Sequence, residues 1–238
     1  MLKGHFFSYN KLGDYMKTHS KIGIILILII SLITVSIHIN AIQENNQLFG
    51  MVYYIDAGHG GRDNGAGVDS VLEDEINLLI AGYLFEELTN RGAYVLLTRT
   101  DDYDLATLYD KNRKRKDLLK RVENINNSKP DLFVSIHLNT YPSASVHGGQ
   151  VFYKRSSDES KLIAESIQTE LNDLSNKNKT VKTDDYYLLE KTDYHGVIVE
   201  CGFLTNPNER NKLTSEKYQR SIAKAITRGI VQHYLRVK

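Results

Sequence analysis

An alternation of strand-like and helix-like segments over residues 44–238 most constrains what this chain can fold into. Residues 51–56 read MVYYID, a short apolar run typical of a strand, and residues 74–91 carry apolar side chains at helical spacing before Gly92. Further strands are predicted at 93–98, 131–137, 148–154 and 196–200, and further helices at 113–127, 157–175, around Pro207 and at 216–235. Neither an internal repeat nor a Pro- or Ser-rich linker interrupts the pattern, so it predicts one α/β domain over 44–238.

The overall composition narrows the class of protein. Hydrophobic residues make up 41% of the 238 residues and charged residues 25%, which is typical of a folded globular protein. The formal net charge of +1 does not suggest a nucleic-acid-binding protein. Because Cys201 is the only cysteine in the sequence, an intramolecular disulfide and a cysteine-based zinc cluster are both excluded.

The N-terminal segment is basic and then strongly apolar. Four lysines precede residue 22 against one aspartate, and no charged residue occurs between Lys21 and Glu44. An uncharged span of 22 residues is long enough to cross a hydrocarbon core of about 30 Å. We therefore expect residues 1–43 to form a cytoplasmic basic segment and a signal or membrane-anchor helix at about 22–42. An uncleaved anchor is favoured because bulky Ile39 stands at position −3 of the one plausible cleavage site, after Ala41, and the positive lysines then place residues 44–238 outside the cytoplasm.

Three predicted strands end in residues that can bind a metal or move a proton. The first runs into His59 within DAGHGG, the third ends at His137, and the strand GVIVE ends at Glu200. Ligands bind beyond the carboxyl ends of parallel strands in open α/β sheets. If these strands are parallel neighbours, the three side chains converge, and Glu73 at the start of the first long helix lies at the same edge.

Two histidines and a glutamate form a typical catalytic zinc set, which leaves a coordination position for water. His59, Glu73 and His137 are the candidate ligands, and Glu200 is the candidate general base for hydrolysis of an amide. Other interpretations stay open at this point. Glu73 could instead close a capping box with Ser70, and Glu75 competes with it as a ligand. His147 and His195 are reserve candidates in loops.

At these residues the sequence resembles the zinc-dependent N-acetylmuramoyl-L-alanine amidases of bacterial cell walls. The likeness covers nearly all of residues 51–235 and is carried by IDAGHGGRDNGA, EDEINLLIAGYL, VLLTRTDD, RVENIN, LFVSIHLNT and VIVECGFLTNPNE. The resemblance implies metal ligands at His59, Glu73 and His137 and a catalytic glutamate at Glu200, and it favours Glu73 over Glu75. It also implies a central, mostly parallel twisted sheet with helices on both faces. Many members have proline where this chain has Ala57.

The resemblance further implies a substrate and a setting. Family members hydrolyse the amide between the lactyl group of N-acetylmuramic acid and the L-alanine of the peptidoglycan stem peptide. The short catalytic domain behind a signal anchor is most similar to the germination-specific amidases of endospore formers, whose product is converted to muramic-δ-lactam after a deacetylase acts. The glycines of DAGHGG would let a bulky glycan-peptide approach the metal.

The expected partners and location follow from that resemblance. They are peptidoglycan, the membrane through the N-terminal helix, an accessory exported protein and a functionally linked muramic acid deacetylase, with no nucleic acid. The expected location is extracytoplasmic, in the intermembrane or cortex space of the forespore if the organism forms spores. A zinc peptidase that cuts within stem peptides and an inactive wall-binding module are the alternatives.

Overall fold

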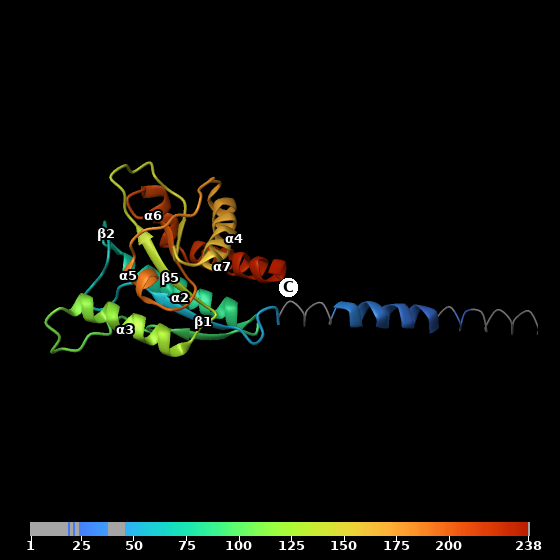
Figure 1. Ribbon diagram of the computed structural model, residues 1–238. Coiled ribbons are helices and arrows are strands. Elements are labelled where there is room, and N and C mark those ends of the chain that lie inside the picture. Colours follow the sequence, from blue (N-terminus) through green and yellow to red (C-terminus); the bar gives the residue numbers. More distant parts are fainter. Residues whose placement is uncertain (1–18, 20, 22–23, 38–45, 238) are drawn as a thin grey trace, which may run out of the picture. The chain divides into compact units, whose positions relative to one another are not determined.

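The computed structural model describes residues 19, 21, 24–37 and 46–237. The chain separates into two compact units, Met1–Asn45 and Asn46–Lys238. The second unit is an α/β domain built on a five-stranded sheet (Figure 1). The predicted fold class of this unit is thereby confirmed, whereas the domain boundary placed between residues 43 and 44 stays a prediction.

The central sheet has the strand order β4-β1-β5-β7-β6 and is mostly parallel. Its strands are β1 (Val52–Ala57), β4 (Tyr94–Leu97), β5 (Leu132–Asn139), β6 (Gln150–Tyr153) and β7 (Gly196–Phe203). The first three and β7 run parallel to one another, and β6 pairs antiparallel with β7 at the edge of the sheet. Strands β1, β5 and β7 are therefore adjacent and parallel as expected, and their carboxyl ends lie at one edge.

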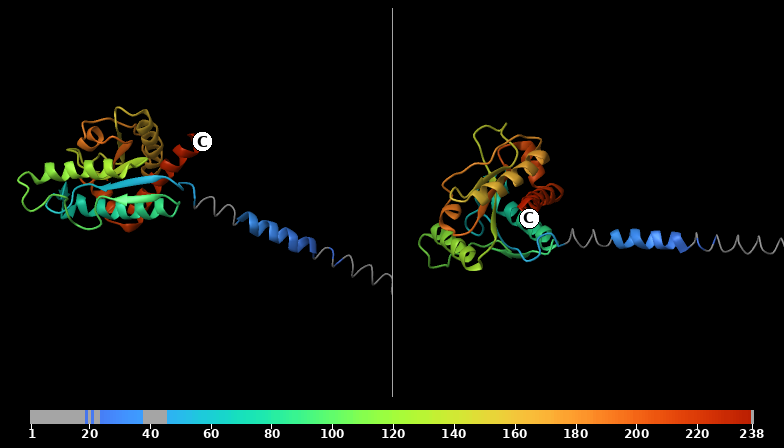
Figure 2. Two further views of the ribbon diagram at one scale, coloured as in Figure 1. Left: turned by 60° about the horizontal axis from the view of Figure 1, so that its bottom comes forward. Right: turned by 45° about the vertical axis from the view of Figure 1, so that its right-hand side comes forward.

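Helices cover both faces of this sheet. One face packs on α2 (Glu73–Thr89), α4 (Asp158–Ser175) and α7 (Glu216–Val237), and the other on α3 (Arg113–Ser128) and α5 (Tyr187–Lys191). The left view of Figure 2 shows α3 and α2 on opposite sides of β1. The alternation of side chains along β7 explains the division, because Val197 and Val199 join the first core cluster while Ile198 joins the second.

The N-terminal ends of the helices can be compared with the capping residues in the sequence. Helix α6 (Pro207–Leu213) begins as predicted, since the Asn206 side chain accepts a hydrogen bond from the Glu209 N–H. Helix α4 is capped by Ser157, whose side chain accepts a hydrogen bond from the Ser160 N–H. Helix α2 has no side-chain cap, so the capping box of Ser70 with Glu73 is not formed. Helix α5 and the hairpin of β2 (Gly67–Val68) and β3 (Val71–Leu72) were not predicted.

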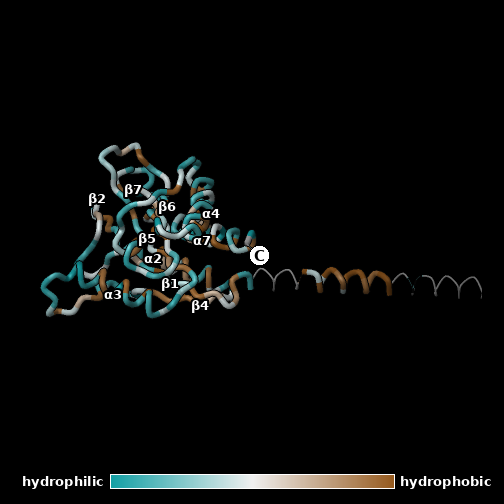
Figure 3. The backbone as a smooth tube through the Cα atoms, in the orientation of Figure 1, coloured by the Kyte–Doolittle hydropathy of each residue, from teal (hydrophilic) through white to brown (hydrophobic). Residues whose placement is uncertain are grey.

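Residues 24–37 of the N-terminal unit form a helix, and Figure 3 shows that it is mostly apolar. Its side chains are exposed. Among residues 19, 21, 24–37 and 46–237, no helix combines the length and apolar character that crossing a bilayer requires. The predicted anchor at 22–42 also includes residues 22–23 and 38–42, which lie outside the described residues.

Candidate active site

The backbone after β1 turns sharply at His59. His59 has a φ of 60°, which is uncommon for a residue with a Cβ, and Gly60 and Gly61 follow with φ values of 121° and 64°. Glycine adopts such angles without steric cost, so the GG pair lets the chain reverse directly after the histidine. The His59 imidazole is thereby held at the end of β1, above the edge of the sheet.

Glu73 is the first residue of α2 and is 3% exposed. Its carboxylate accepts hydrogen bonds from the backbone N–H of Ala66 at 2.8 Å and of Leu138 at 3.0 Å. Its Oε1 also lies 3.3 Å from His59 Nε2 and 3.0 Å from His137 Nδ1. Burial opposes the negative charge, but the hydrogen bonds with the two histidines outweigh it and hold the pKa of Glu73 well below its usual range. The group is therefore a carboxylate at neutral pH.

His59, Glu73 and His137 each offer one ligand atom, and these atoms lie within 4.8 Å of one another. Asp63 lies 3.0 Å from His59 Nδ1, where its carboxylate can accept a hydrogen bond from the Nδ1–H group. In the neutral ring, the Nε2 lone pair then faces the Glu73 carboxylate. Both atoms, His59 Nε2 and Glu73 Oε1, are then hydrogen-bond acceptors, and at a separation of 3.3 Å they require a proton or a cation between them. The donor set of two imidazoles and a carboxylate fits zinc.

Two glycines leave the room that this group occupies. A Cβ on Gly58 would lie 2.3 Å from the His137 ring, and a Cβ on Gly65 would lie 2.5 Å from the Glu73 carboxylate and 2.7 Å from the His59 ring. Any larger residue at either position would therefore displace a candidate ligand. The first glycine of DAGHGG thus makes room for a neighbouring side chain of the protein itself.

Glu200 lies beside this group on β7, directly opposite His137 in the strand register. It is 6% exposed, and the Tyr186 hydroxyl donates a hydrogen bond to its Oε1 at 3.1 Å. Its Oε2 is buried and has no hydrogen-bond partner among the described residues. Burial is the main influence on Glu200 and raises its pKa above the usual range of a glutamate. A raised pKa makes the carboxylate a stronger base for accepting a proton.

A buried polar network lies under the turn after β1. Asp56 accepts hydrogen bonds from Thr98 and Ser135 at 2.6 Å each and pairs with Arg121 at 2.7 Å. Burial alone would raise the pKa of Asp56, but the charge of Arg121 and the two hydroxyl hydrogen bonds lower it to about 2. The network therefore holds a buried charge pair with its hydrogen bonds satisfied.

Two arginines bind the carbonyl groups of this turn. Arg121 donates to the Ala57 carbonyl at 2.8 Å and to the His59 carbonyl at 2.6 Å. Arg99 donates to the Ala57 carbonyl at 3.0 Å and to the Gly58 carbonyl at 3.1 Å. Both arginines are almost completely buried. They fix the backbone that positions His59, although neither contacts the imidazole.

The remaining candidates lie apart from the group. Glu75 is exposed, so the structure selects Glu73 of the two glutamates as the residue that meets the histidines. His147 contacts the carbonyl of Ser145 in a loop, and His195 contacts Ser157 before β7 begins. Neither joins His59 and His137.

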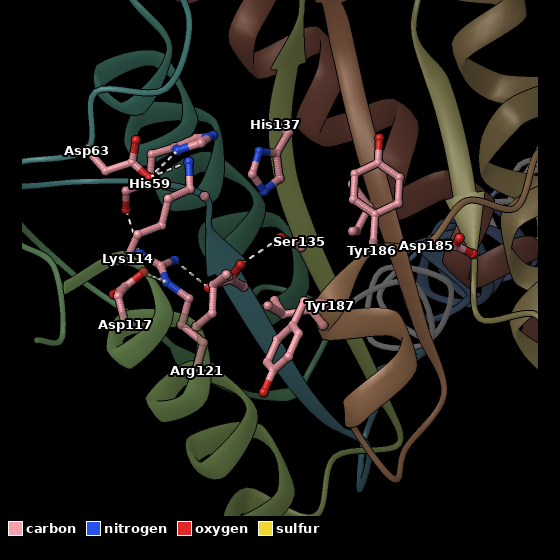
Figure 4. A pocket seen from close by; sticks show the side chains of 15 residues that line it. His59, Asp63, Lys114, Asp117, Arg121, Ser135, His137, Asp185, Tyr186 and Tyr187 are labelled. Carbon is pink, nitrogen blue, oxygen red and sulfur yellow. Dashed lines mark hydrogen bonds and ion pairs between the residues drawn. The ribbon is translucent and has the colours of Figure 1, made fainter. Parts of the chain in front are cut away.

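The sequence analysis did not identify two residues that lie beside the candidate ligands and Glu200. Asp63 stands four residues after His59, a spacing that could have suggested a partner for the imidazole. No local signal distinguishes Tyr186 from the other tyrosines. Figure 4 shows His137 between His59 and Tyr186. These residues and Arg121 line a cavity of about 210 Å³.

Comparison with known proteins gives consistent matches. The family model described as N-acetylmuramoyl-L-alanine amidase matches residues 53–232, a span that includes all four candidate residues. The germination-specific N-acetylmuramoyl-L-alanine amidase of Bacillus subtilis is 38% identical over 192 residues, which are 79% of this chain and 81% of that relative. The solved CwlD amidase from Clostridioides difficile, in complex with the GerS lipoprotein, is 40% identical with a TM-score of 0.75. It matches 79% of this chain and 100% of its own. The catalytic domain of CwlV from Bacillus (Paenibacillus) polymyxa is 31% identical with a TM-score of 0.68, over 79% of this chain and 99% of its own.

Proposed function

The chain belongs to the N-acetylmuramoyl-L-alanine amidase family, and on that premise we propose that it is a zinc enzyme that cleaves the amide between N-acetylmuramic acid and L-alanine in peptidoglycan. The observation that carries the proposal is the convergence of His59, Glu73 and His137, whose ligand atoms lie within 4.8 Å, beside Glu200. The three would hold the metal, and Glu200 would move the proton.

The donor set suits the chemistry of amide hydrolysis. Zinc bound there supplies a Lewis acid that polarises the scissile carbonyl and lowers the pKa of water toward about 7. The buried Glu73 carboxylate and the Asp63 contact to His59 Nδ1 hold two of the three donors in place before metal arrives. His137 lies in β5, and His59 lies two residues after the end of β1. The parallel pairing of these two strands therefore brings the histidines close together.

Glu200 has the properties of the proton-transfer group. Its free Oε2 can accept the proton of the attacking water, which a raised pKa favours, and can then give that proton to the leaving nitrogen of L-alanine. Tyr186 holds the other oxygen at 3.1 Å and so orients the carboxylate. The carbonyl carbon gains the water oxygen, the C–N bond breaks, and the alanine leaves as an amine.

The biological setting is proposed from the relatives. One relative is a germination-specific amidase, which supports a role in spore-cortex maturation, where stem-peptide removal precedes deacetylation and muramic-δ-lactam formation. A similar solved amidase is in complex with a lipoprotein, which supports an accessory exported protein as a partner of this chain. The basic segment and uncharged span before Glu44 support export with a retained membrane anchor.

The test is the digestion of purified peptidoglycan by the full chain loaded with zinc, followed by assay of newly freed L-alanine amino groups. We expect release by the unaltered protein and none above background by Glu200→Gln, which keeps the shape of the side chain. If the freed amino groups belong to residues inside the stem peptide while the muramoyl–alanine links stay intact, the protein is a peptidase instead. If nothing is released and no zinc is bound, a wall-binding module is the better description.

Metal binding has a separate test. Replacing His137 with Ala removes one of three ligands, so we expect zinc content after dialysis to fall well below one per chain while circular dichroism stays unchanged. His147→Ala is the matched control, since His147 lies apart from the group. Full zinc occupancy in His137→Ala would mean that a ligand has been misplaced.

A further inference from the structure

A second cavity lies next to the candidate active site, on the β6 side. It measures about 490 Å³, and we call it the β6 cavity. Its lining includes Asn139, Gln150, Phe152, Lys179, Lys182 and Phe203. The cavity of about 210 Å³ that His59 and His137 line is called the β1 cavity.

The β6 cavity adjoins the group that would act on the scissile amide. Gln150 is the register partner of Glu200 across the β6–β7 pair. The Phe152 ring contacts the Tyr186 ring with centroids 5.0 Å apart, and the Tyr186 hydroxyl in turn bonds Glu200. Tyr186 itself lines the β1 cavity. A substrate bound with its amide at Glu200 can therefore extend one arm into each cavity.

The two cavities differ in charge. The β1 cavity is lined by four aspartates, Asp56, Asp63, Asp117 and Asp185, against Lys114 and Arg121. The residues that line the β6 cavity include Lys179 and Lys182 and no carboxylate. Within the described part of the chain, no carboxylate lies within ion-pair distance of either lysine. An anionic group would therefore be attracted to the lysines of the β6 cavity.

The two lysines are held in different ways. The Lys179 ammonium donates to the Gly148 carbonyl and lies 4.5 Å from the centroid of the Phe203 ring, so it is fixed in place. The nearby acid Glu209 is buried, and its oxygens already accept from the Gly148 and Phe203 N–H groups. An ammonium has three donors, which leaves Lys179 able to bind a further acceptor.

Lys182 is the more available of the two. Its backbone pairs with β6, since its N–H donates to the Val151 carbonyl at 3.0 Å and its carbonyl accepts from the Tyr153 N–H at 3.1 Å. Its side chain is exposed while lining the cavity. The backbone pairing fixes where the side chain starts, and replacing that side chain leaves the pairing intact.

We propose that the β6 cavity binds the peptide arm of the substrate, with Lys182 and Lys179 pairing with a free carboxylate of the stem peptide beyond its first alanine. This inference rests on the proposed amidase function. The carboxylate fixes the direction in which the substrate lies across Glu200, because the opposite arm carries the sugar and no such charge. The lysines thus act on substrate selection and take no part in the chemical step.

The test compares soluble peptidoglycan fragments with free carboxylates and the same fragments after their carboxyl groups are converted to amides. With the full chain, we expect kcat/KM to be roughly fivefold higher for the free acids, mainly through KM, with the preference shrinking at high salt. Lys182→Met should reduce the preference, Lys182→Arg should retain it, and Lys182→Glu should reverse it. Lys224→Met is the matched control, since Lys224 is exposed on α7 at the other face of the sheet.

The outcomes separate the two proposals. Equal cleavage of both fragment pools by the unaltered protein overturns the inference and leaves the amidase function standing. A Lys182→Met variant that retains the full preference for the free acids also overturns it. Failure to release L-alanine amino groups from the free-acid fragments overturns the proposed function itself.

Discussion

Asp56 in β1 and Glu200 in β7 lie toward the carboxyl ends of two parallel strands, called here the β1 end and the β7 end. Their carboxyl groups differ in how many hydrogen-bond partners they have. At the end of β1, Asp56 has three partners and the carbonyl of His59 accepts from a buried guanidinium. In the carboxyl-terminal half of β7, Glu200 has one side-chain hydrogen bond, from Tyr186, and one buried oxygen without a partner among the described residues. Both carboxyl oxygens of Asp56 have hydrogen-bond partners, whereas only one oxygen of Glu200 has one within the described part of the chain.

This difference in hydrogen bonding suits two different tasks, which are to position a metal ligand and to transfer a proton. A metal ligand must be held in one geometry, and buried hydrogen bonds and charge pairs provide that rigidity at the end of β1. A proton-transfer group benefits from a pKa above that of an ordinary glutamate, and burial raises the pKa of Glu200 in β7. We therefore expect substitutions at the β1 end to reduce stability and substitutions at the β7 end to reduce activity.

The largest effect is expected from Glu200→Gln. The amide cannot take a proton, so the rate of amide hydrolysis should fall by about 10³-fold. The free energy of unfolding should stay the same or rise, because a buried group that resists carrying charge is replaced by a neutral one. Steady-state kinetics and urea unfolding of the same preparation measure both. A clear loss of stability would mean that the β7 end is structural as well.

Next in size is Arg121→Met. Its removal leaves Asp56 as an uncompensated buried charge and frees the His59 carbonyl, so the free energy of unfolding should fall by about 3 kcal/mol or more. Urea unfolding measures the change, and Arg115→Met on the exposed side of the same helix is the control. A loss below about 1 kcal/mol would contradict the description of this end as the rigid one.

The acid stability of the β1 end gives a smaller effect. The pKa of Asp56 is about 2 in the fold and 3.8 ordinarily, so its contribution is complete above pH 4 and is lost as the pH falls toward 2. This group should account for roughly 2 kcal/mol of the acid-induced loss of stability. Urea unfolding between pH 5 and 2 tests the value, and Asp56→Asn should give a flatter dependence. An unchanged slope in that variant would assign the loss to other carboxyl groups.

The smallest effect is expected from Tyr186→Phe. The hydroxyl hydrogen bond lowers the pKa of Glu200, so its loss should raise that pKa further. Since the base must be ionised, the acid limb of the pH–rate profile should move to higher pH, with a few-fold lower rate at its acid side. A profile that keeps its position while the rate falls at every pH would assign Tyr186 to substrate contact instead.

Much of this architecture could be predicted locally. The strand at 196–200 and the helix after Asn206 follow from a continuous apolar run and from an Asn-Pro start, and both are observed. The predicted end of the strand at Glu200 is wrong, because β7 continues to Phe203 and Glu200 lies inside it. Helix α5 could not be predicted, because its five residues YLLEK are too short to show a period. Among residues 19, 21, 24–37 and 46–237, no helix is both long and apolar enough to cross a bilayer.

The sequence by itself determined which residue types lie in or just after the carboxyl-terminal parts of three buried strands, because strand and helix periodicity depends on neighbouring residues. It also allowed the α/β class to be predicted, and with it the expectation that His59, His137 and Glu200 share an edge. The family resemblance favoured Glu73 over Glu75, and the structure places Glu73 beside the histidines. Only the tertiary structure decided which carboxylate lacks a partner. These properties depend on distances between segments far apart in the chain, such as Tyr186 and Asp63, and no local pattern encodes them.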